Sequence, residues 1–252
     1  LQNAPSSAWD VSEAGDRSVL AWMDNGNLYV AADGAIAPNP DAAWLFQDFV
    51  NMKTINFGNC FDTSDVTRMR GMFNGCSSLT DLDLSGFDTS SVTDMRMMFQ
   101  NCASLTSLDL PGFDTSSVTD MRVMFQNCAN LTSLDVSSFD TSNVIDMGAM
   151  FANCERLTGL DLSGFDTSHV TNMAAMFCIC EDLTSLDLTG FDTSNVAYMS
   201  DMFRYCTSLT NLNLSGFDAS AVTKMDNMFY GCDNLPDIIC SDSKILKEFR
   251  NR

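Results

Sequence analysis

The stretch LDLSGFDTSSVTDM, from Leu82 to Met95, decides the fold because nearly the same residues return every 26 positions. A period of about 20–29 residues with the pattern L-x-x-L-x-L, as in LTDLDL at residues 79–84, is typical of leucine-rich-repeat solenoids. One unit is too small to bury its apolar residues alone, so stacked units must share a core. The phenylalanine of the stretch recurs at Phe61, Phe87, Phe113, Phe139, Phe165, Phe191 and Phe217.

Two elements are expected in each unit. Residues 82–84 alternate leucine, aspartate and leucine, which predicts a short strand whose copies form a parallel sheet. In residues 92–99 the apolar side chains recur at i, i+3, i+6 and i+7, which predicts a short helix with its apolar stripe toward the sheet. The sequence therefore predicts an α/β fold, a right-handed leucine-rich-repeat solenoid with the sheet on one face and short helices on the other.

The two ends of the chain depart from the repeat. Residues 1–40 are predicted to form an N-terminal β-hairpin cap, because Asn25-Gly26 separates two alternating apolar runs. Residues 41–240 are predicted to be the solenoid, with one degenerate unit followed by seven 26-residue repeats. Residues 241–252, which include SKILKEFRNR, are expected to form a C-terminal cap, as a short basic helix, or a frayed tail.

The composition excludes several functional classes. With 13 basic and 33 acidic residues the net charge is −20, so nucleic acid is not an expected partner. No run of 18 or more apolar residues occurs, so no membrane insertion is expected. A hydrophobic content of 45% is enough for a packed core, which argues against a disordered acidic segment.

The unit LTDLDLSGFDTSSVTDMRMMFQNC, residues 79–102, resembles the 26-residue repeat of BspA-like bacterial surface leucine-rich-repeat proteins, which also occurs in mycoplasma-type lipoproteins. The resemblance covers about residues 41–240. It implies an extracellular or cell-surface bacterial protein that adheres to host or neighbouring-cell proteins. Anchoring to wall or lipid is also implied, although the chain shows neither a lipobox cysteine nor a sorting motif.

Stacking turns each repeat position into a column of equivalent residues. Aspartates between two inward leucines must point away from the core, and they form what we call the mid-strand column. Three interpretations of this column remain: a solvated acidic face, a binding face for a basic or polar partner, and, less favoured, Ca²⁺ bridging between neighbouring carboxylates. The column consists of Asp83, Asp109, Asp135, Asp161 and Asp187.

A second acidic column, here the turn column, precedes Thr and Ser in every unit. Carboxylates at such positions accept backbone N–H bonds in Asx turns, so we expect a structural role. Exposed tyrosines near the C-terminal end, Tyr198, Tyr205 and Tyr230, are an alternative contact patch. The turn column consists of Asp62, Asp88, Asp114, Asp140, Asp166, Asp192 and Asp218.

The remaining reactive side chains favour structural roles. One cysteine per unit, from Cys76 to Cys232, predicts buried free thiols. Cys178 lies outside that column and is the thiol expected to be exposed, and Cys178 with Cys180 lacks zinc-ligand spacing. His169 is the only histidine, so a catalytic triad has no support. The sequence predicts no enzyme, no metal site and no cofactor.

The favoured function is a non-enzymatic extracellular binding module that adheres to a host or bacterial surface protein or glycan through an extended solenoid face. The alternative is a structural spacer or scaffold domain of a larger cell-surface protein. The sequence does not decide whether the sheet face or the opposite face would bind.

Overall fold

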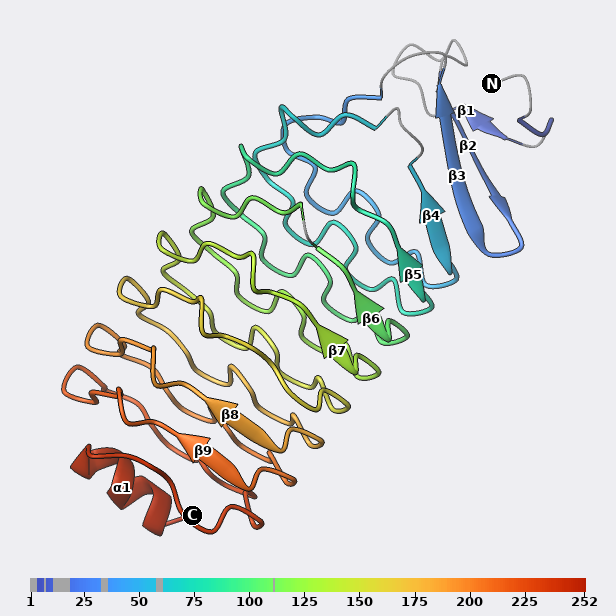
Figure 1. The fold of residues 1–252 in the computed structure, drawn as a ribbon. Helices are drawn as coiled ribbons and strands as arrows, with labels where there is room; N and C mark the ends of the chain where they lie inside the picture. The colour runs from blue at the N-terminus through green and yellow to red at the C-terminus, as the bar shows by residue number, and fades with distance from the viewer. Residues whose placement is uncertain (1–3, 7, 11–18, 33–35, 58–60, 111) are drawn as a thin grey trace.

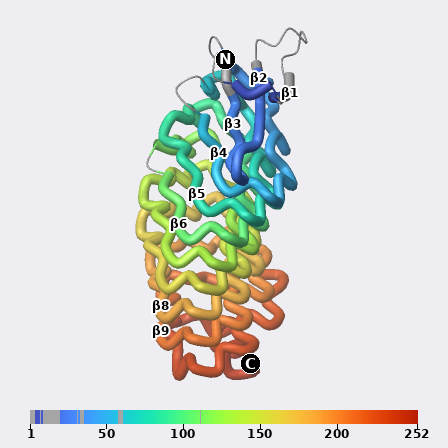
Figure 2. The backbone as a smooth tube through the Cα atoms, turned by 90° about the vertical axis from the view of Figure 1, so that its right-hand side faces the viewer, coloured from blue at the N-terminus to red at the C-terminus, as the bar shows by residue number. Residues whose placement is uncertain are grey.

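The computed structural model describes residues 4–6, 8–10, 19–32, 36–57, 61–110 and 112–252. The chain winds as a series of similar layers stacked along one axis into an elongated solenoid (Figures 1 and 2). A hairpin lies at the N-terminal end and a helix at the C-terminal end (Figure 1). The repeat therefore sets the architecture, as the sequence predicts.

Short strands line one face of the solenoid. They pair in parallel from layer to layer, β4 with β5, β6 with β7 and β8 with β9. The leucine or isoleucine of each strand is buried and its neighbours face outward, which confirms the predicted parallel sheet. The strands are β4 (Thr54–Asn56), β5 (Asp81–Leu82), β6 (Ser107–Leu108), β7 (Ser133–Leu134), β8 (Ser185–Asp187) and β9 (Asn211–Asn213).

The N-terminal end is closed by antiparallel strands. Strands β1 (Trp9–Asp10), β2 (Val19–Asp24) and β3 (Asn27–Ala32) pair in that order. Asn25 and Gly26 make the β2–β3 turn with φ of 51° and 87°, the left-handed conformation that Asn-Gly favours. Because β3 also pairs in parallel with β4, the hairpin supplies the first strand of the stacked sheet.

The predicted helix in each repeat is wrong. In the described residues, α1 near the C-terminus is the only α-helix. Within the predicted helix, Asp94 forms an isolated parallel bridge, and consecutive turns cover residues 96–101. The N–H of Met97 donates to the Arg122 carbonyl at 3.0 Å and that of Phe99 donates to Met124 at 2.9 Å. Backbone donors are thus satisfied by the next layer, so an intrahelical i→i−4 ladder is not needed.

Left-handed residues explain how the turns fit between layers. Met97 and Asn101 have φ of 59° and 62°, and equivalent residues repeat these values along the solenoid. A residue with positive φ interrupts a right-handed helical conformation, because L-residues adopt the left-handed region only as single residues. The backbone therefore forms separate turns in place of a continuous helix. Asn suits the position, and the Asn127 side chain adds a 2.6 Å bond to Asn101 Oδ1 in the layer before.

The core between the two faces consists of stacked side-chain columns. Phe99, Phe125 and Phe151 lie one above the other with ring centroids 5.6 and 5.7 Å apart. Methionines of the repeat, such as Met95, Met98, Met121 and Met124, are buried in the same core. Each column cysteine from Cys76 to Cys232 is a buried free thiol that donates to a phenylalanine carbonyl of the preceding layer, as Cys128 does to Phe99 at 3.2 Å.

Buried threonines connect the layers next to the turn column. Thr89 Oγ1 donates to the Asp114 carbonyl at 2.9 Å and accepts the Asp114 N–H at 2.8 Å. Thr89 is 1% exposed, and its equivalents from Thr63 to Thr193 are equally buried. One hydroxyl therefore satisfies two backbone groups of the following layer.

Replacing Thr89 with the isosteric valine is expected to lower the free energy of unfolding by about 1–3 kcal/mol, because both Asp114 backbone groups lose a partner. Urea unfolding followed by circular dichroism measures the loss. Thr93→Val is the matched control, since Thr93 is exposed and water can replace its hydroxyl bond. An equal effect of the two substitutions would contradict the role given to Thr89.

The last layer is covered by α1 (Ser243–Arg250), whose buried residues are Ile245 and Phe249. Asp242 is its N-cap and accepts the N–H groups of Lys244 and Ile245. Asp242 also accepts the N–H of Ala219 at 3.0 Å. Ala219 occupies the threonine position in the last layer, where no further layer follows. Its own backbone N–H and carbonyl are instead bonded by Asp242 and Lys244 of the C-terminal segment.

Candidate binding face

The mid-strand column lies on the outward side of the sheet. All five aspartates are exposed, while the residues before and after each one are buried or half-buried. Asp83, Asp135 and Asp161 accept the N–H of the residue two positions later at 2.9–3.0 Å, and Asp187 does the same. These carboxylates are therefore fixed at strand ends, a constraint that the sequence interpretation assigned only to the turn column.

Hydrogen bonds favour the charged form of three aspartates in this column. Bonds from Ser85, Ser137 and Ser163 lower the pKa of Asp83, Asp135 and Asp161 respectively. Asp109 differs, because the residue two positions later is Pro111, which has no N–H to donate. The Asp109 carboxylate thus lacks the bond that orients the other members of the column.

The turn column has the predicted Asx geometry in every layer. Each aspartate accepts the N–H of the serine two positions later, for example Asp88 from Ser90 at 3.0 Å. Bonds to the following serine also lower the pKa of Asp62, Asp88, Asp140, Asp166 and Asp192. The other pairs are Asp62–Ser64, Asp114–Ser116, Asp140–Ser142, Asp166–Ser168, Asp192–Ser194 and Asp218–Ser220.

A third polar column was missed from the sequence. It lies on the face that is formed by residues 94–101 and their equivalents in the other layers, which we call the turn face and which is distinct from the turn column. Arg96 lies between two carboxylates, 2.6 Å from Asp94 and 3.5 Å from Asp120. Arg122 continues the chain of ion pairs, 3.1 Å from Asp120 and 3.5 Å from Asp146. The signal was Asp-x-Arg repeated at 94–96 and 120–122. Because these acids are already paired with arginines, this face offers little unpaired charge to a partner.

The tyrosine patch is only partly assembled. The rings of Tyr205 and Tyr230 meet edge to face at 5.4 Å, and the Arg204 guanidinium lies over both. Tyr198 instead lies beneath the ammonium of Lys224 at 5.9 Å. Tyr198 and Tyr230 are exposed and Tyr205 is half-buried. The three tyrosines therefore form one pair and one separate cation–π contact.

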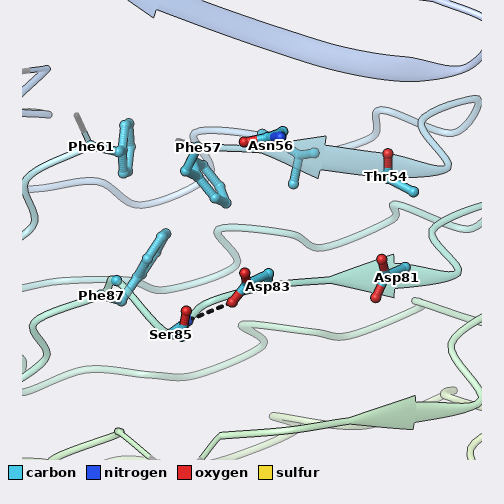
Figure 3. A pocket seen from close by; sticks show the side chains of 10 residues that line it. Thr54, Asn56, Phe57, Phe61, Asp81, Asp83, Ser85 and Phe87 are labelled. Atoms are coloured by element: carbon cyan, nitrogen blue, oxygen red, sulfur yellow. Dashed lines mark hydrogen bonds between the residues drawn. The ribbon is translucent and has the colours of Figure 1, made fainter. Parts of the chain in front are cut away.

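A hollow of about 630 Å³ opens on the sheet face between β4 and β5 (Figure 3). Its aromatic wall consists of Phe57, Phe61 and Phe87, with ring centroids 4.8–5.6 Å apart. Its other side carries the carboxylates of Asp81 and Asp83 (Figure 3). The remaining lining residues are Thr54, Ile55, Asn56, Ser85 and Gly86.

The hollow lies where the spacing of the repeat changes. Ile55 pairs with Leu82, a step of 27 residues, whereas Phe61 and Phe87 are 26 apart. Phe57 occupies the position of Leu84 in the next layer, so a large ring replaces an aliphatic side chain there. The extra residue and the larger ring distinguish this site from the regular layers.

A second hollow of similar volume lies over β6, β7 and residues 158–161. Asp109, Asp135 and Asp161 line it, and Gly159 replaces the polar side chain found at the equivalent position of other layers. No aromatic residue lines this hollow among the described residues. A further, smaller hollow is lined by Asp161, Asp187 and Phe191, so members of the mid-strand column border hollows of different chemistry.

The described residues contain no group of three or more His, Cys, Asp or Glu side chains arranged for a metal ion. His169 is exposed, with Nδ1 3.4 Å from Ser168 Oγ. Cys178 is half-buried, and burial raises its pKa, which leaves the thiol less nucleophilic than an ordinary cysteine. None of the helices in the described ranges is long and apolar enough to cross a bilayer.

Two solved structures are similar: a leucine-rich cell surface protein from Faecalibacterium prausnitzii A2-165 and a leucine-rich-repeat protein from Eubacterium ventriosum. The first has 14% identity and a TM-score of 0.31, over 99% of this chain and 98% of that chain. The second has 18% identity and a TM-score of 0.32, over 94% and 79%.

No curated protein matches the chain significantly. The family described as "Mycoplasma protein of unknown function, DUF285" matches residues 41–158 and, in an overlapping second match, residues 128–241. This match confirms the resemblance to the mycoplasma-type repeat. The chain therefore belongs to the DUF285 family of mycoplasma-type repeat proteins.

Proposed function

We propose that this chain is a non-enzymatic binding module, outside the cell or on the surface of a bacterium. It adheres to a host or neighbouring-cell protein or glycan through the sheet face. The mid-strand column carries this proposal, because its carboxylates are exposed, and four of the five are held by backbone bonds at regular spacing. A partner would meet a surface that needs little reordering, which lowers the entropic cost of binding.

The sheet face is a better candidate than the turn face. Asp94, Asp120 and Asp146 on the turn face are already paired with Arg96 and Arg122. The mid-strand aspartates have no ion-pair partner among the described residues. The hydrogen bonds that they accept come from uncharged groups, which are the backbone N–H two positions later and, at Asp135, also the Ser137 hydroxyl. Their charge is therefore available to a partner with basic or polar groups, through many weak contacts along the rigid surface.

Replacing Asp109, Asp135 and Asp161 together with serine is expected to reduce adhesion at least tenfold, about the loss of one strong charged contact. Adhesion is measured as binding of labelled protein to epithelial cells and immobilised matrix proteins at two salt concentrations. The control replaces Glu155, Glu181 and Asp233 with serine. These exposed acids directly follow the column cysteines and lie outside the mid-strand column, and their replacement removes the same total charge. Equal adhesion of both variants would refute the sheet-face site.

The alternative function is a spacer or scaffold domain of a larger surface protein. Continuous bonding between layers favours it, because parallel bridges connect equivalent residues from Asp41 to Lys224 without a break. We take the winding as right-handed, the sense that parallel strand connections favour. A spacer predicts that the triple serine variant folds and adheres like the original chain.

A further inference from the structure

We propose that the hollow between β4 and β5 binds an arginine side chain from a basic segment of a partner protein. This inference rests on the proposed binding function and names the chemistry that one part of the sheet face recognises. The hollow combines an aromatic wall of Phe57, Phe61 and Phe87 with the carboxylates of Asp81 and Asp83 (Figure 3).

The hollow has negative charge without a matching cation. None of its ten lining residues is basic. Lys53 precedes the lining residue Thr54, but its aliphatic stem lies against Gly26 in the hairpin turn. Asp81 and Asp83 have no ion-pair partner among the described residues, and Asp83 accepts the Ser85 N–H at 2.9 Å. A cation that enters would therefore supply the missing charge.

The aromatic wall selects among cations. Phe61 and Phe87 stack with centroids 5.6 Å apart, and Phe61 is half-buried, so part of its ring is open to a ligand. A guanidinium group is planar, stacks on aromatic faces and binds carboxylates with two parallel bonds. A lysine ammonium is a strongly hydrated point charge and uses the ring less well. The geometry thus favours arginine over lysine.

A neutral sugar is the main competing ligand, because sugars also lie against aromatic rings. Two ionised carboxylates would then remain without a counter-charge, whereas a guanidinium satisfies both the rings and the charge. The second hollow provides an internal comparison: it contains Asp109, Asp135 and Asp161 but no aromatic lining residue. A ligand that needs only negative charge would use both hollows equally.

The test uses the full chain and a short arginine-containing peptide, with binding followed by isothermal titration. Analogues in which citrulline or lysine replaces arginine, and a neutral oligosaccharide, are the other probes. We expect the citrulline peptide to bind at least tenfold more weakly and the lysine peptide about threefold more weakly. Equal binding of the citrulline peptide, absence of arginine-peptide binding, or binding of the oligosaccharide alone would overturn the proposal.

Two variants of the hollow and one control variant test whether the peptide binds at this hollow. Asp81→Asn with Asp83→Asn should weaken the arginine peptide at least tenfold, and Phe61→Leu about threefold. Asp135→Asn with Asp161→Asn removes the same charge from the second hollow and should change affinity less than about twofold. Equal losses in both double variants would show general attraction and overturn the proposal. Because the peptide assay needs no cells, its result is independent of the adhesion assay.

Discussion

Replacing Phe125 with alanine is expected to lower the free energy of unfolding by about 3–5 kcal/mol. Phe125 is 0% exposed and lies between the rings of Phe99 and Phe151 at 5.6 and 5.7 Å. The substitution opens a cavity in the middle of a continuous aromatic column. The layers above and below are held in place by the rest of the core, so they cannot easily move to close the cavity. The stacking energy with both neighbouring rings is lost as well.

Urea unfolding of the full chain, followed by circular dichroism, measures this change. Ile145→Ala is the control, because Ile145 is 51% exposed and its removal should change the free energy of unfolding by less than about 0.5 kcal/mol. If Phe125→Ala cost no more than Ile145→Ala, the phenylalanine column would not be the core that holds the layers together.

The layered architecture could be predicted because a solenoid converts sequence period into spatial position. Once equivalent residues lie above one another, a residue between two inward leucines must face outward, as Asp109 and Asp135 do. The buried thiols from Cys76 to Cys232 follow by the same reasoning, since one small apolar side chain per layer fills the same core position. These conclusions needed the period and the burial pattern alone.

The helix prediction failed because consecutive turns imitate the apolar spacing of a helix. Met98 donates to the Met95 carbonyl, an i→i−3 bond, so apolar residues recur about every three residues without a helix. The distinguishing signal was the column in which Gly75, Asn101, Asn127 and Asn153 follow one another, residue types that accept left-handed φ, although Ile179 and Tyr205 adopt the same φ in later layers. A helix interior would not place them at one position in successive repeats.

The hollow between β4 and β5 could not be predicted from the period, because it arises where the period changes. The step of 27 residues before Phe61 shows an insertion but not where Phe57 points. Whether a ring fills or borders a space depends on packing against Phe61 and Phe87, which only the structure describes. Irregular positions in a repeat protein are therefore the places where side-chain geometry adds information.

Replacing Phe249 with alanine is expected to destabilise the C-terminal layers by about 3–5 kcal/mol while leaving β4 and β5 unaffected. Phe249 is buried in α1, meets the Phe229 ring edge to face at 5.3 Å and lies beneath the Arg252 guanidinium at 3.7 Å. Its loss uncovers the end of the phenylalanine column. Because each layer contacts only its neighbours, the damage should remain near that end.

Hydrogen exchange measured by peptide mass spectrometry separates a local effect from a global one. In the Phe249→Ala variant, peptides from residues 217–235 should exchange faster, and peptides that contain β4 and β5 should keep their protection. Lys247→Ala is the control on the same helix, because Lys247 is exposed and should change exchange little. Equal loss of protection at both ends would mean that the solenoid unfolds as one cooperative unit, which contradicts nearest-neighbour stabilisation of its layers.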